Sequence, residues 1–572
     1  MINWKEMPNS GNGTMPPPLN SSGPMPRIDK ARGPSQATRL VMLSNDVEFF
    51  HTQEGRPYGT IAVQGHYETW HVGSTHFREW LAHSFYQAEK SVPNGWALDD
   101  ALTEINAKAK YVGHELQVST RVAESEGNIY LDLGDPDWRA VEVTPSGWSI
   151  VSHPPVRFRR SNGMGALPTP ERGGRISSLR RFVNVKDDDW ILFVSWLIAA
   201  LRPEGPYPIL GLNGEQGSAK TTTGKVARRL IDPFKAPMRA KPRNEQDLMI
   251  TASTSHIITL DNLSNIEQWL SDALCRLSTG GGLATRKLYT DEEETIFDAQ
   301  RPILLNGIED VAVKGDLLDR MLILSLPEIS DKERQEEAVF WAEFELVRPQ
   351  ILGALLNGVS AALNNASTVK LDKKPRMADF AIWVTAAECE LGFKEGEFIA
   401  AYTKNREEAS DVALESSPVA TEVVEFMRDK NEWEGTTGEL LERLNARANK
   451  GSRTRSVLPT SPKRLSNALT RLKPNLRNAG ITIHHLPREA ARRPIRLEKR
   501  PTPEPQLLQS PQPRADQEVS RDGSCDVKRD DVGGAGTAFS EGCDDVTVRD
   551  DRSQPSHSAA IDPLIPAVEV VW

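Results

Sequence analysis

The alternation of apolar and polar positions divides the chain into segments of different character. Between residue 38 and about residue 160, short β-rich runs surround one helical stretch near 96–110, where Leu98, Leu102 and Ile105 recur at helical spacing. Three further runs in this segment are separated by turn residues and predict a meander of three strands. Residues 38–160 are therefore expected to form a small α+β domain.

The pattern changes at about Ile176, where apolar β-runs begin to alternate with helical stretches as far as Ile329. This alternation is typical of a parallel sheet with crossover helices, so residues 161–330 are predicted to form an α/β core. Ala- and Leu-rich sequence then predicts a helical domain over 331–417. The fold class expected is an α/β core with small flanking units.

A second small unit is predicted over residues 418–500. Apolar residues at helical spacing predict helices near 419–427, 437–444 and 461–472, and two short β-runs follow at 481–485 and 494–497. Three helices followed by a hairpin are the elements of a winged-helix variant of the helix-turn-helix. The third helix would be the recognition helix.

The two ends of the chain carry little apolar periodicity. Residues 1–37 are rich in Pro, Gly, Ser and Asn, and residues 501–572 hold 14 acidic and 6 basic residues. Such segments bury too little apolar surface to offset the entropy of ordering, so both are predicted to be disordered.

Whole-chain composition excludes several classes of protein. The net charge is -10, and the four cysteines form no C-x-x-C pair, which argues against a zinc ribbon and against a disulfide framework. The first residues are polar, and the sequence shows no run of 18 apolar residues. A cytoplasmic protein without a membrane partner is expected.

A strand, a glycine-rich loop and a helix follow one another near residue 214. The apolar run 208–212 leads into Gly214-Glu215-Gln216-Gly217-Ser218-Ala219-Lys220-Thr221-Thr222, where a helix begins. Backbone N–H groups of such a loop bind phosphates, Lys220 can reach the β- and γ-phosphates, and Thr221 can hold magnesium. The segment predicts an ATP and Mg²⁺ site, although Ala219 replaces the usual last glycine. The α/β core is therefore expected to be a P-loop NTPase.

Two more apolar runs end in polar side chains. The first ends at Asp261, which would bind Mg²⁺ through water, and Asn262 follows where a catalytic glutamate is usual. The second ends at Asn306, a candidate sensor of the γ-phosphate, although a turn asparagine before Gly307 would give the same sequence. An asparagine can orient a water but cannot take its proton, so slow hydrolysis or a carboxylate from elsewhere is expected.

Arg320 precedes the last apolar run of the core. It is a candidate arginine finger, which would stabilise charge on the transferred phosphoryl group of a neighbouring subunit. The alternative is an ion pair with Asp316 or Asp319.

Two other groups of polar residues favour structural roles. Asp132 and Asp135 could be mistaken for the two metal-binding carboxylates of a polymerase-type site. Positions on a strand face and in a turn explain these two residues more simply. His66, His71 and His76 have a spacing that matches neither one helix face nor a usual zinc site.

The order of these motifs, with the Gly-rich basic segment 278–289 between Asp261 and Asn306, resembles the superfamily 3 helicase core of phage and mobile-element primase-helicases. The resemblance spans about residues 120–420, although convincing primase motifs are absent from the N-terminal segment. It implies a hexameric ring that acts on DNA beside other replication proteins. It also implies that Arg286 and Lys287 lie on a hairpin in the central pore and grip DNA phosphates.

Local charge adds a second DNA-binding candidate. Residues 441–500 hold 16 basic and 3 acidic residues, a net charge of +13, and Lys463, Arg464 and Arg471 fall on the predicted recognition helix. A solvated charged face is the alternative interpretation. The function expected is an ATP-driven DNA helicase or translocase of phage or mobile-element replication.

Three other functions stay open. The chain could be a nucleotide-dependent switch that assembles on DNA, an interpretation that Asn262 supports. It could also be an ATPase that remodels proteins, or a catalytically weak protein whose basic C-terminal unit provides the function.

Overall fold

The computed structural model describes residues 33–263, 266–281, 283–286, 294–297, 300–307, 315–415, 417–448, 458–487, 494–499 and 570–571. Most of the two predicted disordered segments lies outside these ranges. The boundary at residue 37 is wrong, because helix α1 already begins at Gln36. The Ser35 side chain caps this helix by accepting a hydrogen bond from the backbone N–H of Thr38 at 3.1 Å.

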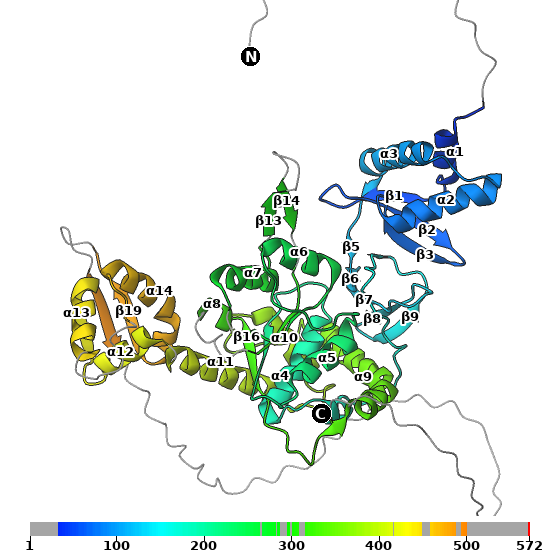
Figure 1. Ribbon diagram of the computed structural model, residues 1–572. Coiled ribbons are helices and arrows are strands. Elements are labelled where there is room, and N and C mark those ends of the chain that lie inside the picture. The colour runs from blue at the N-terminus through cyan, green and yellow to red at the C-terminus, as the bar shows by residue number, and fades with distance from the viewer. Residues whose placement is uncertain are drawn as a thin grey trace, which may run out of the picture.

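The N-terminal unit is a mixed four-stranded sheet with strand order β3-β2-β1-β4 and three helices (Figure 1). Its apolar core contains Leu40, Phe77, Leu81 and Ile105, and the helix predicted near 96–110 is confirmed as α3. The elements are α1 (Gln36–Leu43), β1 (Glu48–His51), β2 (Pro57–Val63), β3 (His66–His71), α2 (Thr75–Glu89), α3 (Gly95–Tyr111) and β4 (His114–Glu115).

The predicted meander is confirmed and has a fourth strand, in the order β6-β7-β8-β9. Its apolar face shares a core with helices of the central and helical domains. Trp148 Nε1 donates to Asn357 Oδ1 at 2.8 Å, and Ser360 Oγ donates to the carbonyl of Thr144 at 2.7 Å. The strands are β5 (Val118–Ser119), β6 (Val122–Ser125), β7 (Asn128–Asp132), β8 (Ala140–Thr144), β9 (Gly147–Val151) and β10 (Arg157–Phe158), the last of which pairs with β5.

The central domain contains a parallel sheet in the order β12-β15-β11-β16. The strand that ends in Asn306 therefore lies between the P-loop strand and the strand that precedes Asp261. The elements are η1 (Ile176–Phe182), α4 (Asp187–Ala200), β11 (Ile209–Asn213), α5 (Lys220–Ile231), α6 (Glu245–Thr254), β12 (Ile258–Leu260), α7 (Gln268–Thr279), β13 (Leu283–Arg286), β14 (Glu294–Phe297), β15 (Ile303–Asn306), α8 (Gly315–Leu318) and β16 (Met321–Ser325).

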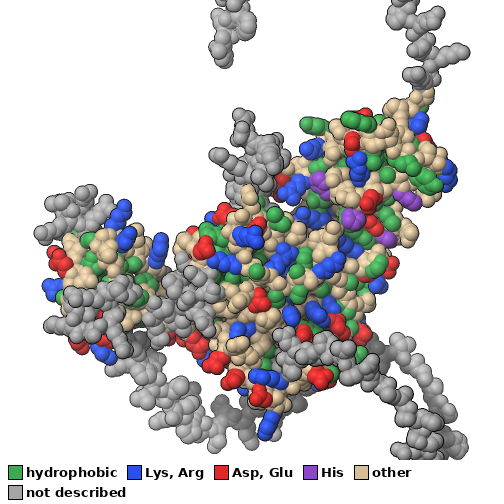
Figure 2. Space-filling view, in the orientation of Figure 1, with side chains coloured by type: hydrophobic (Ala, Val, Ile, Leu, Met, Phe, Trp, Pro, Cys, Tyr) green, Lys and Arg blue, Asp and Glu red, His purple; other side chains and the backbone are tan. Residues whose placement is uncertain are grey.

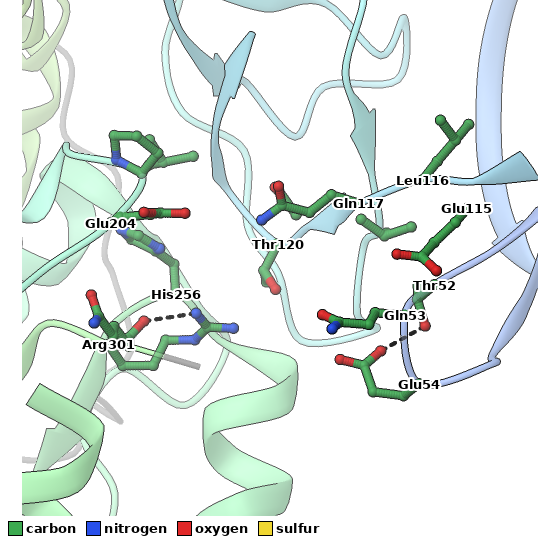
Figure 3. Close-up of a pocket in the computed structure, with 15 residues that line it drawn as sticks. Thr52, Gln53, Glu54, Glu115, Leu116, Gln117, Thr120, Glu204, His256 and Arg301 are labelled. Carbon is green, nitrogen blue, oxygen red and sulfur yellow. Dashed lines mark hydrogen bonds between the residues drawn. The ribbon is translucent and has the colours of Figure 1, made fainter. Parts of the chain in front are cut away.

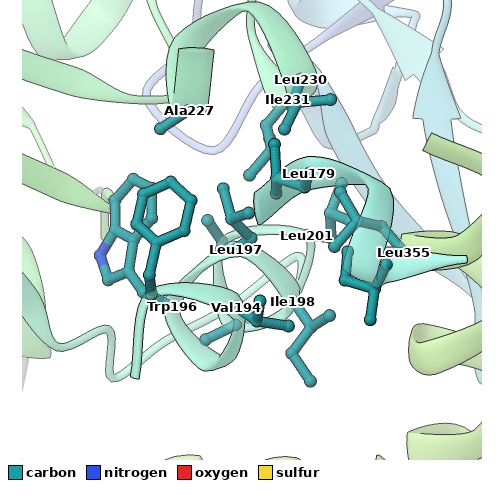
Figure 4. Packing of buried hydrophobic residues seen from close by; sticks show 14 of the residues in the cluster. Leu179, Val194, Trp196, Leu197, Ile198, Leu201, Ala227, Leu230, Ile231 and Leu355 are labelled. Atoms are coloured by element: carbon teal, nitrogen blue, oxygen red, sulfur yellow. The ribbon is translucent and has the colours of Figure 1, made fainter. Parts of the chain in front are cut away.

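Helix α4 lies at the centre of the largest core. All its residues from Trp190 to Ala200 are buried, as expected for a helix that is apolar on every face. Figure 4 shows Leu197 of this helix in the centre of a buried cluster that also contains Leu230 of the P-loop helix and Leu355 of α9 (Glu337–Asn365). Helix α4 thereby packs between the C-terminal end of the P-loop helix and the helical domain.

The helical domain consists of α9, α10 (Ala378–Ala387) and α11 (Glu397–Glu415), and the short strand β17 (Gln335–Glu336) precedes it and pairs with β21 (Val570–Val571). Among the described residues, α9 alone is long and apolar enough to cross a membrane. It is a core helix, with Phe340, Phe344 and Leu355 fully buried.

The C-terminal unit continues directly from α11 (Figure 1). The three predicted helices and the two predicted strands are confirmed, and the sequence did not predict the additional strand β18, which pairs with β20. The elements are α12 (Pro418–Met427), β18 (Glu432–Thr436), α13 (Thr437–Ala448), α14 (Pro462–Asn478), β19 (Ile481–His485) and β20 (Pro494–Lys499).

Candidate nucleotide site

The loop between β11 and α5 has the tight backbone that a phosphate-binding loop needs. Gly214 has a φ of +150°, and a Cβ there would lie 2.6 Å from the carbonyl oxygen of Leu326 and from Ser218 Oγ. Gly217 has a φ of +86°. Ala219, which replaces the usual glycine, has a left-handed φ of 60°, so the loop keeps this conformation at some cost in strain.

The first residues of α5 provide the cation and the hydroxyl. Lys220 Nζ donates to the carbonyl oxygens of Gly214 and Glu215, both at 2.6 Å. Its ammonium therefore lies over the loop and can turn toward a phosphate that enters there. A helix N-terminus adds further positive potential at the same place.

Three side chains from different elements meet at the carboxyl edge of the sheet. Asn306 Nδ2 donates to Thr221 Oγ1 at 3.0 Å and to Asp261 Oδ1 at 2.5 Å. Thr221 Oγ1 lies 3.4 Å and 3.5 Å from the two carboxylate oxygens of Asp261. The structure thus brings together the residues predicted to hold Mg²⁺ and the predicted sensor.

The chemistry of this group suits a hydrated magnesium ion. Hydroxyl and carboxylate oxygens are ligands that Mg²⁺ accepts while it keeps several waters. Within the part of the chain that the structure describes, Asn306 Oδ1 is buried and has no hydrogen-bond partner. It is therefore available to accept a hydrogen bond from a bound water.

The backbone gives a reason for asparagine at position 262. Asn262 has a left-handed φ of 55°, which asparagine tolerates better than most residues. Gly307 packs against it, since a Cβ on Gly307 would lie 3.1 Å from Asn262 Cα and 2.9 Å from the backbone nitrogen of Leu263. The Asn306-Gly307 pair thus belongs to the site, and Gly307 is the residue that allows the close approach.

Asn184 is a residue of the site that sequence patterns did not indicate. Its Nδ2 donates to the carbonyl of Ser218 in the P-loop at 3.2 Å and to that of Pro327 at 2.6 Å. It joins the loop to the segment after β16. A single asparagine outside any motif carries no signal in the sequence.

Arg320 forms an ion pair with Asp316, as the alternative interpretation predicted. Its Nη1 is 2.6 Å from Asp316 Oδ1, and the side chain is 15% exposed. Asp316 and Asp319 are also paired with Arg376. An arginine finger role for Arg320 stays a prediction that needs a second subunit.

The two DNA-binding candidates fall on separate elements. Arg286 ends β13, which pairs with β14 in an antiparallel hairpin that projects from the core (Figure 1), and Lys287 lies outside the described residues. Lys463, Arg464 and Arg471 are exposed on α14. Figure 2 shows Lys and Arg side chains along the upper edge of the C-terminal unit.

A buried cluster of charged side chains stabilises the C-terminal end of the P-loop helix α5. Asp232, at the end of α5, accepts from Arg121 Nε at 3.1 Å and from the backbone N–H groups of His256 and Ile257 at 2.9 Å and 3.1 Å. Burial acts to raise the pKa of Asp232, but Arg228 and Arg121 outweigh it and lower the pKa to about 2. The carboxylate stays ionised and links the meander, α5 and β12.

The opposite edge of the sheet borders a cavity of about 590 Å³ that faces the N-terminal unit (Figure 3). Glu204, His256 and Arg301 line one side, and Glu54 and Glu115 line the other. Burial lowers the pKa of His256 to about 4, although Asp232 opposes the change. This cavity lies away from the P-loop and does not belong to the nucleotide site.

Asp132 and Asp135, for which a structural role was predicted, both form ion pairs with arginines. Asp132 is held by Arg160 at 2.6 Å, and Asp135 by Arg139 at 2.6 Å. No group of three or more His, Cys, Asp or Glu side chains within the described ranges is placed to hold a metal ion.

The predicted structural histidines lie at the two ends of β3 and in the first turn of α2. His66 contacts Glu68 at 3.0 Å, His71 packs edge-on against Tyr58, and His76 stacks on Trp70.

Comparison with known families identifies the central and C-terminal regions. Residues 176–409 match the family model of the actinomycete integrative conjugative element replication protein, and residues 419–512 match the model of the AICE RepA C-terminal domain. Together the two ranges cover more than half of the 572 residues. The central and C-terminal regions are thus each similar to a part of this family of replication proteins. The expected role in mobile-element replication is therefore confirmed.

No curated protein matches this replication protein. Among solved structures it is similar to the A form of the apo NrS-1 C-terminal region, at 12% identity and a TM-score of 0.33, over 81% of this chain and 98% of that one. It is also similar to the active helicase Cch of SCCmec type IV, at 9% identity and a TM-score of 0.45, over 79% and 92% of the two chains. Similarities at this level carry no argument about activity.

Proposed function

We propose that this replication protein is a superfamily 3-type motor that hydrolyses ATP with Mg²⁺ and uses the energy to move along or unwind the DNA of its element. The observation that carries the proposal is the convergence of Lys220, Thr221, Asp261 and Asn306 at one edge of the sheet. Lys220 and Thr221 are adjacent in the loop and helix that follow β11, whereas Asp261 follows β12 and Asn306 ends β15. The site therefore joins three segments that are far apart in the sequence.

Each residue has a distinct task in this proposal. Lys220 neutralises the β- and γ-phosphates, Thr221 and Asp261 hold the magnesium ion, and Asn306 orients the γ-phosphate or the attacking water. Arg320 would act on the site of the next subunit in a ring. Residues of this kind contribute through position and charge, because phosphoryl transfer needs little covalent chemistry from the protein.

The C-terminal unit is proposed to be a winged-helix domain that binds duplex DNA. The observation behind this is the order α12-β18-α13-α14-β19-β20, in which α14 exposes Lys463, Arg464 and Arg471. The unit has its own apolar core, which includes Leu440, Leu444, Leu465 and Leu469. In the full chain, changing the three cations to Ala should weaken duplex binding and reduce its salt slope by up to about three units. An unchanged salt dependence of duplex binding would show that these three side chains do not contact DNA, and would contradict the DNA-binding role of this unit.

A second function, a nucleotide switch without sustained hydrolysis, is favoured by one observation. Position 262 holds an asparagine in a left-handed conformation, which glutamate adopts less readily. ATP binding would then change the assembly of the protein on DNA, and turnover would be slow.

Measuring ATP turnover and duplex unwinding with and without single-stranded DNA separates the two functions. A motor shows turnover that DNA stimulates and unwinding that depends on ATP. A switch shows ATP-dependent DNA binding with little turnover. If ATP neither turns over nor alters DNA binding, both proposals are wrong.

A further inference from the structure

A cavity of about 520 Å³ lies beside the P-loop. Its walls come from residues 183–186, before α4, and from residues 327–335, after β16. Asn184 connects both walls to the P-loop through its hydrogen bonds to Ser218 and Pro327. One lining residue of the cavity is thus hydrogen-bonded to the loop that is proposed to bind phosphates.

The walls of this cavity combine apolar side chains with a charged rim. Val183, Val185 and Ile329 are buried, at 2%, 6% and 5% exposure, whereas Lys332 and Glu333 are exposed at the rim. Cavities of this size with an apolar lining and a few polar groups are typical of small-ligand sites. A flat base with its ribose fits this chemistry.

Arg334 lies where the cavity meets the P-loop. One terminal nitrogen of its guanidinium is 3.5 Å from the position that a Cβ on Gly217 would occupy. Its carboxylate partner, Asp331, is 3.0 Å away and 89% exposed, so this pair is weak in water. The guanidinium can therefore exchange this partner for a phosphate oxygen.

We propose that this cavity holds the base and ribose of the nucleoside triphosphate, and that Arg334 contacts the phosphates of the nucleotide bound in its own subunit. The inference rests on the proposed ATP site and adds to it the nucleoside subsite and a second cation. Lys220 and Arg334 then approach the phosphates from the helix side and from the cavity side of the same loop.

The test compares ATP with inorganic triphosphate, both with Mg²⁺, as competitors of a fluorescent ATP analogue. In the natural protein, ATP should bind at least about tenfold more tightly than triphosphate, since only ATP fills the cavity. Ile329→Trp should remove this advantage and leave triphosphate binding unchanged. Ile250→Trp, at a site on α6 that is 61% exposed, is the matched control and should change neither affinity.

Arg334→Ala should weaken both ligands by roughly tenfold, because a charge-assisted hydrogen bond to the phosphates is lost. Arg334→Lys should recover part of the loss. Arg428→Ala, which removes a guanidinium that is 72% exposed on the C-terminal unit, should have no effect. Equal affinity of ATP and triphosphate in the natural protein, or an Arg334→Ala variant that binds normally, overturns the proposal.

Photolabelling with 8-azido-ATP tests the same site without a variant. The label should map to residues 183–186 or 327–335, and a label found only elsewhere overturns the nucleoside subsite. The Lys220→Ala variant distinguishes failure of the nucleoside subsite from failure of the ATP site. If Lys220→Ala loses binding of both ATP and triphosphate while Ile329→Trp keeps full ATP affinity, only the cavity inference fails. If Lys220→Ala binds both ligands normally, the P-loop proposal itself fails.

Discussion

Replacing Asp232 by Asn should destabilise the central domain by about 3–5 kcal/mol. The substitution keeps the shape of the side chain and removes its charge. Arg121 and Arg228 are 0% and 1% exposed and would remain as buried guanidiniums without their counterion. Breaking a buried ion pair by removing one partner has a cost of this size.

The hydrogen bonds around Asp232 explain why Asn cannot replace it. The two carboxylate oxygens accept from Arg121 and from the backbone N–H groups of His256 and Ile257. One end of an asparagine amide is a donor, so at least one of these donors would face another donor. The packing of the surrounding core would stay the same, which isolates the electrostatic effect.

Thermal unfolding followed by tryptophan fluorescence measures the effect, since Trp190 and Trp196 lie in the same core. A loss of 3–5 kcal/mol corresponds to a fall in Tm of about 6 to 20 °C for a domain of this size. Asp99→Asn is the control, because Asp99 pairs with Arg78 at the surface, where the two side chains are 61% and 41% exposed. It should cost less than about 1 kcal/mol.

The pH dependence gives an independent check. The pKa of Asp232 is about 2, below its ordinary value of 3.8. The stabilisation of about 2 kcal/mol that this shift represents is present above pH 4 and is lost as the pH falls toward 2. The difference between the natural protein and Asp232→Asn should therefore narrow below pH 4. A Tm that Asp232→Asn lowers by less than 2 °C at pH 7 would refute the reasoning.

Three further outcomes are expected. Ala219→Gly should raise Tm slightly and keep ATP binding, because glycine adopts the left-handed φ without strain; a lower Tm in scanning fluorimetry would contradict this. Arg320→Ala should bind ATP but lose turnover, and mixing it with Lys220→Ala should restore part of the turnover if the arginine acts in trans; no recovery in assembled mixtures would assign Arg320 to its ion pair alone. Arg286→Ala combined with Lys287→Ala should keep basal ATP turnover and lose its stimulation by DNA, and stimulation that survives would exclude the hairpin from DNA binding.

Local patterns predicted most of the elements and the residues at the strand ends. Asp261 and Asn306 could be placed at one site because parallel strands end at the same edge of a sheet. The contacts between remote segments could not be predicted in this way. Arg121 reaches Asp232 across 111 residues, and Asn184 bridges two loops that share no motif. Such contacts depend on how the layers pack, which apolar periodicity does not specify.

The meander shows the same limit. Its strands follow from alternation and turn residues, but their packing against α9 depends on contacts such as Trp148 with Asn357. Asn262 illustrates a different case. The departure from glutamate was visible in the sequence, while its left-handed backbone was not.

Nucleotide binding by Lys220→Ala tests the central claim most directly. Lys220 is the cation that lies over the P-loop, and its removal leaves the loop backbone in place. Titration of the natural protein with a fluorescent ATP analogue and Mg²⁺ should give saturable binding that unlabelled ATP displaces, and Lys220→Ala should abolish it or weaken it at least tenfold while Tm stays unchanged. Equal affinity in the two folded proteins would contradict the assignment of the P-loop.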